Sequence, residues 1–355
     1  MKEAKDSAEL LVLDFDQFGV EAIAVQLESS EVLWHQDVGR LLRSFQGQDV
    51  LESFTSGTTG RPKLIIHTKE QLTQSARRTL SFFKLQPGDV VLSPLSIDFI
   101  AGKMMVIRSV IGRLKLIITS PTGNPFDHFD ATAQMKFSVL VPYQLSKIKA
   151  ECPQRINELG TLLVGGGALS DELIAFLIEA KVRSFQSYGM TETMTHFALR
   201  QLTPHTEQSF QCLPEYHVSI KDEDLLVIHN DQLFDEPIYT SDRIKLLDHQ
   251  RFIWLGRKDN VINSGGVKLS PELIERKIRK QYSNWPVFII SKMTHPSLGE
   301  CPVFVHVHGD SFPEEVLSEI AMLLNKYEKP RAVKVVRQFQ YTSSGKIRRN
   351  NLVFI

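Results

Sequence analysis

The chain contains few cysteines, no long apolar run and no excess of charge. Its 355 residues include three cysteines that lie far apart with no Cys-x-x-Cys pair, which excludes a disulfide scaffold and a cysteine-rich zinc site. No apolar run approaches the roughly eighteen residues of a membrane-spanning helix, and Met1 to Glu9 lacks the apolar core of a signal peptide. Forty-one basic residues balance forty-one acidic ones, so no nucleic-acid partner is expected. We expect a cytoplasmic protein without membrane insertion that acts on a small molecule.

Apolar and amphipathic stretches alternate along most of the chain. Its composition, 42% apolar and 23% charged, is that of a globular protein with room for two domains. Up to residue 164, predicted helices separate short predicted strands, an order that indicates α/β layers. From residue 197 onward, short alternating runs predict a β-rich subdomain, with a distorted barrel as one possible form. The last part predicts a small α+β domain with a helix at 271–281, capped by Ser270, and another at 313–326.

A hydroxyl-rich turn lies between two apolar runs that predict a β-hairpin, residues 50–54 and 64–66. Its glycines let the backbone approach a phosphate, its hydroxyls donate hydrogen bonds, and Lys63 adds a positive charge. The spacing is not that of a Walker loop, because no Lys-Ser or Lys-Thr follows a Gly-x4-Gly pattern. We predict that the turn binds a triphosphate through Thr55, Ser56, Gly57, Thr58, Thr59, Gly60 and Lys63.

A second motif, Ser187-Tyr188-Gly189-Met190-Thr191-Glu192-Thr193, follows a predicted strand at 182–186. Together with the turn at 55–63, it resembles the adenylate-forming superfamily of acyl-CoA synthetases, luciferases and peptide-synthetase adenylation domains. The resemblance implies that Tyr188, beside Gly189, stacks on adenine, that Thr191 bonds the α-phosphate and that Glu192 holds Mg²⁺. A hard cation of this kind takes carboxylate and phosphate oxygens.

Other stretches follow the order of the superfamily. The resemblance implies that Gly165, Gly166 and Gly167 contact adenine, although glycines at a strand end also form a tight connection to a helix, here capped by Ser170. Asp242 would accept hydrogen bonds from both ribose hydroxyls. Arg257 would reach the ribose or a phosphate, and Asp259 would be the hinge between two domains.

Two later motifs concern the second half of the reaction and the catalytic lysine. Gly265 and Gly266 would lie beside the pantetheine arm of coenzyme A, but Val267 follows them where relatives usually carry Glu. Ser344-Gly345-Lys346-Ile347 resembles the catalytic-lysine motif, although the Pro that usually precedes it is absent. The resemblance implies that Lys346 bonds the substrate carboxylate and the α-phosphate, and a basic surface tail is the alternative.

Residues 99–105 occupy the place of the acyl pocket, with Phe99 where the superfamily usually has His. Lys103 or Arg108 could pair with a second substrate carboxylate, while Lys103 could equally be a solvated helix lysine. The short segment before the phosphate loop and this stretch are most similar to the o-succinylbenzoate-CoA ligases of menaquinone biosynthesis. Their substrate carries two carboxylates and an aromatic ring.

The resemblance therefore implies an α/β fold with three parts. These are an adenylation domain at 1–256 that includes the β-rich subdomain, a hinge at 257–259, and a mobile α+β lid domain at 260–355. The implied activity is an AMP-forming acid-CoA ligase that uses ATP, Mg²⁺ and coenzyme A on a small carboxylic acid. A short aryl- or fatty-acyl-CoA ligase and a non-catalytic nucleotide-binding module stay open. So does a homodimer, because relatives carry a longer segment before the phosphate loop.

Overall fold

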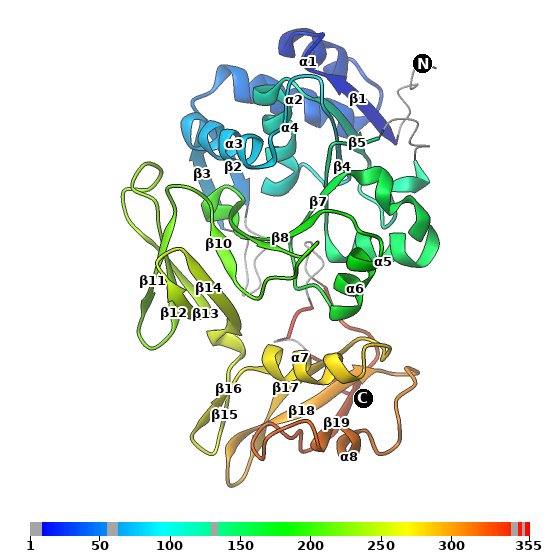
Figure 1. Cartoon of the computed structure of the whole chain (residues 1–355), viewed down its shortest axis with the longest axis vertical. Coiled ribbons are helices and arrows are strands. Elements are labelled where there is room, and N and C mark those ends of the chain that lie inside the picture. Colours follow the sequence, from blue (N-terminus) through cyan, green and yellow to red (C-terminus); the bar gives the residue numbers. More distant parts are fainter. Residues whose placement is uncertain (1–8, 55–62, 129–133, 342–346, 350–351) are drawn as a thin grey trace. The chain divides into compact units, whose positions relative to one another are not determined.

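The computed structural model describes residues 9–54, 63–128, 134–341, 347–349 and 352–355 of the chain (Figure 1). The chain divides into two compact units. The first takes residues 1–168 and 176–207, and the second takes residues 169–175 and 208–355.

Parallel strands form the middle of the sheet in the first unit. The order is β1 (Leu10–Asp14), β5 (Lys115–Thr119), β4 (Val90–Ser93), β6 (Phe137–Leu140), β7 (Thr161–Val164), β8 (Ser184–Gly189) and β9 (His196–Gln201). Strands β5 to β8 in this order run parallel, while β1 and β9 run antiparallel to their neighbours β5 and β8. Parallel neighbours need crossover connections, and most of those here contain a helix. This confirms the predicted α/β class.

Helix α3 (Lys69–Phe83) begins at a side-chain cap. Thr68 accepts a hydrogen bond from the amide of Gln71 at 3.1 Å, and the Gln71 side chain accepts one from the amide of Thr68 at 2.9 Å, which completes a capping box. The helix α3 therefore begins at Lys69, directly after this cap. The helices are α1 (Val20–Glu28), α2 (Leu33–Gly47), α3 (Lys69–Phe83), α4 (Ile100–Gly112) and α5 (Pro142–Glu151), with short 3₁₀ turns η1 (Pro125–Asp127) and η2 (Pro153–Leu159); α6 (Asp171–Glu179) crosses the sequence boundary between the units.

A separate two-stranded hairpin flanks the hydroxyl-rich turn. Strand β2 (Val50–Phe54) pairs antiparallel with β3 (Leu64–Thr68), so that Phe54 lies opposite Leu64. Leu51 and His67 face one another on one side of the hairpin. The predicted hairpin is confirmed.

Antiparallel strands form the first part of the second unit. The order is β10 (Phe210–Cys212), β14 (Arg251–Arg257), β13 (Ile238–Asp248), β12 (Leu225–His229) and β11 (His217–Lys221). This confirms the predicted β-rich region. No described strand joins β11 back to β10, so the described strands form an open sheet rather than the distorted barrel that we considered.

The C-terminal part of the second unit is α+β, as predicted. Strands β15 (Ile262–Ser264), β16 (Val267–Leu269), β17 (Phe288–His295), β18 (Gly299–Val307) and β19 (Val333–Val336) form one sheet, with helices α7 (Pro271–Gln281) and α8 (Val316–Ala321). Alternate residues of β17 face two cores: Phe288 and Ile290 join Ile274 and Phe304 in one, while Ile289 joins another. This period of two is what a strand buried on both faces requires.

The predicted helix at 313–326 is too long. Only α8, Val316–Ala321, is α-helical. The amide of Val316 bonds to the carbonyl of Pro313, and the amide of Leu323 to that of Ile320, so tight turns with three-residue spacing replace α-helical bonds on both sides. Ser270 does precede α7, but its hydroxyl donates to the carbonyl of Leu255 at 2.6 Å instead of capping the helix.

Candidate active site

Part of the predicted site lies outside the described residues. Thr55, Ser56, Gly57, Thr58, Thr59, Gly60 and Lys346 are in this group. Lys63 is described, and it is exposed immediately before β3.

The turn after β8 presents Thr191 and Glu192. Gly189 ends the strand at a point where a Cβ atom would lie 1.9 Å from the carbonyl oxygen of Thr195, so only glycine fits there without a backbone shift. The short 3₁₀ turn η3 (Thr191–Thr193) follows, held by a 3.0 Å hydrogen bond from the amide of Met190 to Oγ1 of Thr193. Thr191 and Glu192 are half-buried. Among the described residues, the carboxylate of Glu192 has no hydrogen bond or ion pair in the structure, and its oxygens suit a hard cation.

His67 is a buried histidine of β3. Burial, together with the nearby Lys103 cation, lowers the pKa of His67 to about 4, and the nearby backbone of Thr191 partly opposes this shift. A neutral imidazole therefore lies on the strand that follows the phosphate loop, and its Nε2 atom has no hydrogen-bond partner among the described residues. Nothing in the sequence pattern singled out His67, because a histidine within an apolar strand has no motif.

Lys103 lies on α4 and reaches the same hairpin. Its ammonium donates to the carbonyl of Glu52 at 2.6 Å, and burial lowers its pKa. The solvated-lysine alternative is therefore not what the structure has. Phe99, the other predicted pocket residue of this segment, is half-buried and is the residue that precedes α4.

Arg108 is a buried cation held by neutral groups. Only 2% of the surface of Arg108 is exposed. It donates to the hydroxyl of Thr79 at 3.1 Å and to that of Thr195 at 2.6 Å, and a third nitrogen lies 3.7 Å from the sulfur of Met105. No described carboxylate pairs with it, and burial lowers the pKa of Arg108 to about 9. A positive charge in such a place is costly unless an anion approaches it.

The three glycines after β7 form a close connection. A Cβ on Gly165 would lie 2.4 Å from the hydroxyl of Ser187, and Gly166 has a φ of +80°. The carbonyl of Gly167 accepts a hydrogen bond from Gln186 at 3.2 Å. The glycines therefore let this connection pack directly against β8. Tyr188, at the end of β8, packs edge-on against Phe197 with ring centroids 5.5 Å apart, which fixes the orientation of its ring.

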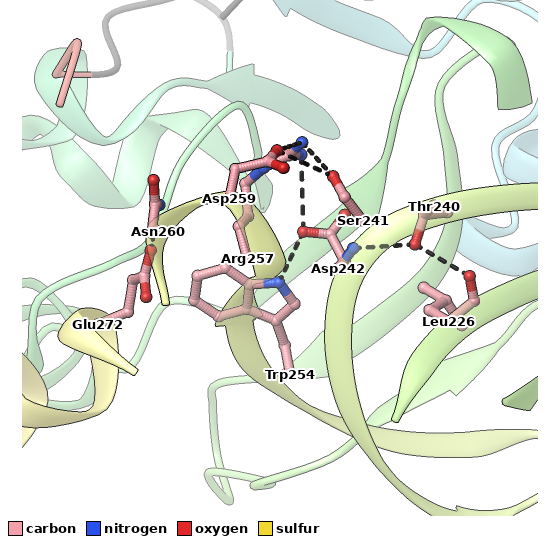
Figure 2. A network of polar contacts seen from close by, with 9 residues as sticks. All are labelled: Leu226, Thr240, Ser241, Asp242, Trp254, Arg257, Asp259, Asn260 and Glu272. Carbon is pink, nitrogen blue, oxygen red and sulfur yellow. Dashed lines mark hydrogen bonds and ion pairs between the residues drawn. The ribbon is translucent and has the colours of Figure 1, made fainter. Parts of the chain in front are cut away.

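In the second unit, Asp242, Arg257 and Asp259 form one network (Figure 2). Arg257 lies 3.7 Å from the carboxylate of Asp242 and donates to that of Asp259 at 3.0 Å. Ser241 accepts a hydrogen bond from Arg257 and donates to Asp259 at 3.3 Å. The structure thus brings the predicted ribose ligand, the predicted phosphate ligand and the predicted hinge residue into direct contact.

Figure 2 also shows Trp254 and a second pair beside this network. The indole N–H of Trp254 donates to Oδ1 of Asp242 at 3.2 Å. Asn260, next to Asp259, donates to the carboxylate of Glu272, and burial raises the pKa of Glu272. Trp254 belongs to no motif in the sequence, so its contact with Asp242 was not predicted.

Gly265 and Gly266 form the two-residue turn between β15 and β16. Their φ values are +58° and +84°, a combination that favours glycine in a tight hairpin. Both are exposed, and Val267, which follows, is also exposed. The glycines therefore have a structural reason in this chain apart from any contact with coenzyme A.

Within the described ranges, no group of three or more His, Cys, Asp or Glu residues could hold a metal ion by protein ligands alone. The same part of the chain contains no helix long and apolar enough to cross a membrane.

The comparison with known protein families agrees with these motifs. The family model described as AMP-binding enzyme matches residues 4–232, more than half of the chain. The chain belongs to the AMP-binding enzyme family. This confirms the resemblance that the motifs at 55–63 and 187–193 indicated.

Two named relatives are similar to this family member in sequence. One, a 2-succinylbenzoate–CoA ligase from Listeria innocua, is 26% identical over 327 residues, which cover 84% of this chain and 68% of the relative. The other, a 2-succinylbenzoate–CoA ligase from Bacillus cereus, is 23% identical over 384 residues, with 98% of this chain and 79% of the relative covered.

Two solved structures share the fold. The acyl-CoA synthetase (AMP-forming)/AMP-acid ligase II-like protein from Dyadobacter fermentans is 28% identical with a TM-score of 0.64, covering 95% of this chain and 97% of that one. The o-succinylbenzoate coenzyme A synthetase MenE from Bacillus subtilis, in complex with ATP and magnesium, is 20% identical with a TM-score of 0.73, covering 85% of this chain and 69% of that one. The Dyadobacter protein is thus matched almost from end to end.

Proposed function

We propose that this protein is an AMP-forming acid-CoA ligase whose substrate is o-succinylbenzoate, a step of menaquinone biosynthesis. Membership of the AMP-binding family and similarity to two 2-succinylbenzoate–CoA ligases support the class of reaction. The observation that carries the choice of substrate is Arg108, a buried cation without a described carboxylate partner.

Arg108 suits a substrate with two carboxylates. One carboxylate must react, so the second is available for recognition. Thr195, which Arg108 contacts at 2.6 Å, lies only three residues after Glu192 in the chain, so the buried cation contacts the segment that follows the proposed reaction centre. An anionic group approaching the guanidinium would offset the cost of burying it, and a monocarboxylate would supply no such group. Lys103 is a second candidate for this contact, with Phe99 beside the aromatic part.

The residues of the motifs would bind the nucleotide. The loop at 55–60 with Lys63 and Thr191 would hold the phosphates, and Gly165 to Gly167 with Tyr188 and Gly189 would face the adenine. Asp242 would accept from the ribose hydroxyls, and Arg257 would donate to the ribose or a phosphate. A carboxylate and a guanidinium in contact suit a ligand that carries both hydroxyls and anionic oxygens.

Glu192 would hold Mg²⁺, which supplies charge neutralisation of the phosphate oxygens when bound. The absence of a described partner for this carboxylate is the observation that fits the ion.

The reaction would have two steps. A carboxylate oxygen of the acid attacks the α-phosphorus of ATP, the bond to the β-phosphate oxygen breaks, and pyrophosphate leaves. Lys346 and Thr191 would stabilise negative charge at the α-phosphoryl group. The thiolate of coenzyme A then attacks the acyl carbon, the thioester forms, and AMP leaves with the oxygen that came from the acid.

The same chain would serve both steps by moving its C-terminal domain. We propose the division into an adenylation domain at 1–256, a hinge at 257–259 and a lid domain at 260–355, with Asp259 absorbing the rotation. Gly265 and Gly266 would then lie beside the pantetheine arm. The smooth turn they form, with no side chains, supports that role.

The test is pyrophosphate release from ATP across a panel of acids, with coenzyme A present or absent. The proposal expects release with o-succinylbenzoate, and thioester only when coenzyme A is added. Equal rates with benzoates or medium-chain acids would replace the substrate by a broader acyl class. ATP binding without release by any acid would indicate a non-catalytic module.

We also propose that the protein is cytoplasmic and that it forms a homodimer. Fractionation of cells would test the first, and sedimentation velocity of the purified protein would test the second. A dimer that dissociates without loss of activity would show that the acyl pocket is complete in one chain.

A further inference from the structure

The carboxylate of Asp242 is oriented by a neighbour outside the recognised motifs. Asp242 is 8% exposed, and its backbone amide is held by the hydroxyl of Thr240 at 3.1 Å. Its Oδ1 atom receives the indole N–H of Trp254 at 3.2 Å and lies 3.7 Å from the guanidinium of Arg257 (Figure 2). Both donors approach the same oxygen, so together they restrict rotation of the carboxylate plane.

The position of Trp254 depends on an irregularity in β14. Asp242 lies opposite Arg257 and Ile244 lies opposite Trp254, with a register shift between these pairs. A regular antiparallel ladder would place Leu255 opposite Ile244, and Trp254 would then point to the other face of the sheet. One extra residue in β14 reverses the alternation, so Trp254 and Arg257 share the face that carries Asp242.

Gly256 makes this bulge possible. Its φ is +135°, and a Cβ there would lie 2.4 Å from the hydroxyl of Ser270 and 2.6 Å from the carboxylate of Glu272. A side chain is therefore excluded by backbone conformation and by space. The bulge, the glycine and the indole donor form one local arrangement around Asp242.

We propose that Trp254 is a positioning residue that sets the orientation of the Asp242 carboxylate for the ribose of the nucleotide. The inference rests on the proposed function, since it assumes that Asp242 binds ribose. Because the indole N–H holds one carboxylate oxygen, the carboxylate meets the two ribose hydroxyls in one fixed plane. Phenylalanine keeps an aromatic ring but is smaller than tryptophan and has no N–H donor, so it removes the orientation together with part of the packing.

The test compares Trp254→Phe with the wild type in equilibrium binding of AMP and 2′-deoxy-AMP. The wild type should prefer AMP. Trp254→Phe should bind AMP about five- to tenfold more weakly and lose most of the preference for the 2′-hydroxyl, as expected for one hydrogen bond to a charged acceptor. Trp285→Phe is the matched control, because Trp285 stacks on Tyr282 at 4.1 Å in the C-terminal part of the unit, and it should bind both nucleotides as the wild type does.

A double-mutant cycle separates positioning from general packing. In an Asp242→Asn background, Trp254→Phe should cause no further loss of AMP affinity, because the carboxylate it orients is gone. An additive loss would overturn the inference and assign Trp254 a packing role. Unchanged binding and preference in Trp254→Phe would also overturn it while the proposed function stands. A wild type that binds neither nucleotide would overturn both.

A second measurement uses the wild-type fold directly. The three tryptophans give three indole signals in a ¹H–¹⁵N spectrum, and Trp254→Phe assigns the relevant one. The inference expects this signal to move on addition of AMP and on the Asp242→Asn substitution, while the signal of Trp285 stays in place. A Trp254 signal that moves neither on addition of AMP nor on the Asp242→Asn substitution would contradict the inference.

Discussion

Arg257 donates a hydrogen bond from its guanidinium to the carboxylate of Asp259 at 3.0 Å. The pair joins the residue that we propose for nucleotide contact to the residue that we propose as hinge. The two side chains are 36% and 42% exposed, so water screens the pair and its own contribution to stability is small. Its importance lies in where it holds the guanidinium.

Arg257→Gln should raise the Michaelis constant for ATP about tenfold, because a charge-assisted contact to the ribose or a phosphate is lost. Steady-state kinetics with varied ATP measure this. Asp259→Asn is the control, since it keeps a hydrogen-bond partner for Arg257 and should change that constant by less than about twofold. An equal rise in Asp259→Asn would assign the effect to the pair and not to the nucleotide.

Replacing Arg108 should have different effects on the stability of the protein and on its activity. Arg108→Met should raise the free energy of unfolding by about 1 kcal/mol or leave it unchanged, because it removes a buried charge without a described counter-ion. The same change should raise the Michaelis constant for o-succinylbenzoate more than about tenfold. Urea denaturation and pyrophosphate release measure the two quantities.

Arg113→Gln serves as the control for Arg108. Arg113 follows α4, and its side chain is 62% exposed beside Asp16, so its substitution should alter neither quantity appreciably. A loss of stability in Arg108→Met with no change in the acid dependence would make Arg108 a structural residue only.

Gly189 predicts a defect centred on η3. Gly189→Ala should lower pyrophosphate release by more than about a hundredfold, because a Cβ 1.9 Å from the carbonyl of Thr195 must displace the segment that presents Thr191 and Glu192. Gly47→Ala is matched in chemistry but meets nothing within 4 Å. It should retain full activity and gain slight helix stability.

His67 predicts a loss of stability in mild acid. Its pKa is lowered to about 4 in the folded protein, first by burial and then by Lys103, whereas the unfolded chain binds the proton near pH 6.5. The contribution of His67 to the free energy of unfolding is therefore fully present above pH 6.5. It falls as the pH drops toward 4, by about 3 kcal/mol at most. Denaturation midpoints between pH 7 and 4 measure it.

His67→Asn should reduce this dependence but not abolish it, because buried His196 also has a lowered pKa, owing to burial and to Arg108 and Arg78. His205→Asn, at an exposed position, should leave the dependence unchanged. The same slope in His67→Asn and the wild type would rule out His67 as its source.

Arg349 and Glu275 predict a large structural effect in the C-terminal part. The guanidinium makes two hydrogen bonds, of 2.7 and 2.8 Å, to the carboxylate, and another of 2.9 Å to the carbonyl of Ile290. Both side chains are mostly buried, so Glu275→Gln should cost about 3 kcal/mol by leaving Arg349 without a charged partner. Glu223→Gln, which breaks the exposed pair with Lys268, should cost less than about 0.5 kcal/mol.

Local signals in the sequence predicted much of the fold. The hairpin around the phosphate loop and the strand–helix alternation depend on neighbours in the chain, so their patterns are visible in the sequence. The length of α8 could not be predicted from local signals. Its ends are set by the turns through which Val316 and Leu324 enter the C-terminal core.

The site residues that belong to motifs could be predicted from the sequence. Those that depend on long-range packing could not. Arg108 meets Thr79 and Thr195, whose closeness no sequence spacing could indicate. Trp254 reaches Asp242 only because the bulge in β14 reverses the face of the strand, and a strict alternation of faces would have placed it on the opposite side.

The most direct test of the central claim follows one oxygen atom. The acid is supplied with ¹⁸O in its carboxylate, together with ATP, Mg²⁺ and coenzyme A, and the AMP product is weighed by mass spectrometry. If the carboxylate attacks the α-phosphorus and the thiol then attacks the acyl carbon, one labelled oxygen must appear in AMP. Unlabelled AMP, or ADP in its place, would contradict an acyl-adenylate pathway for this protein.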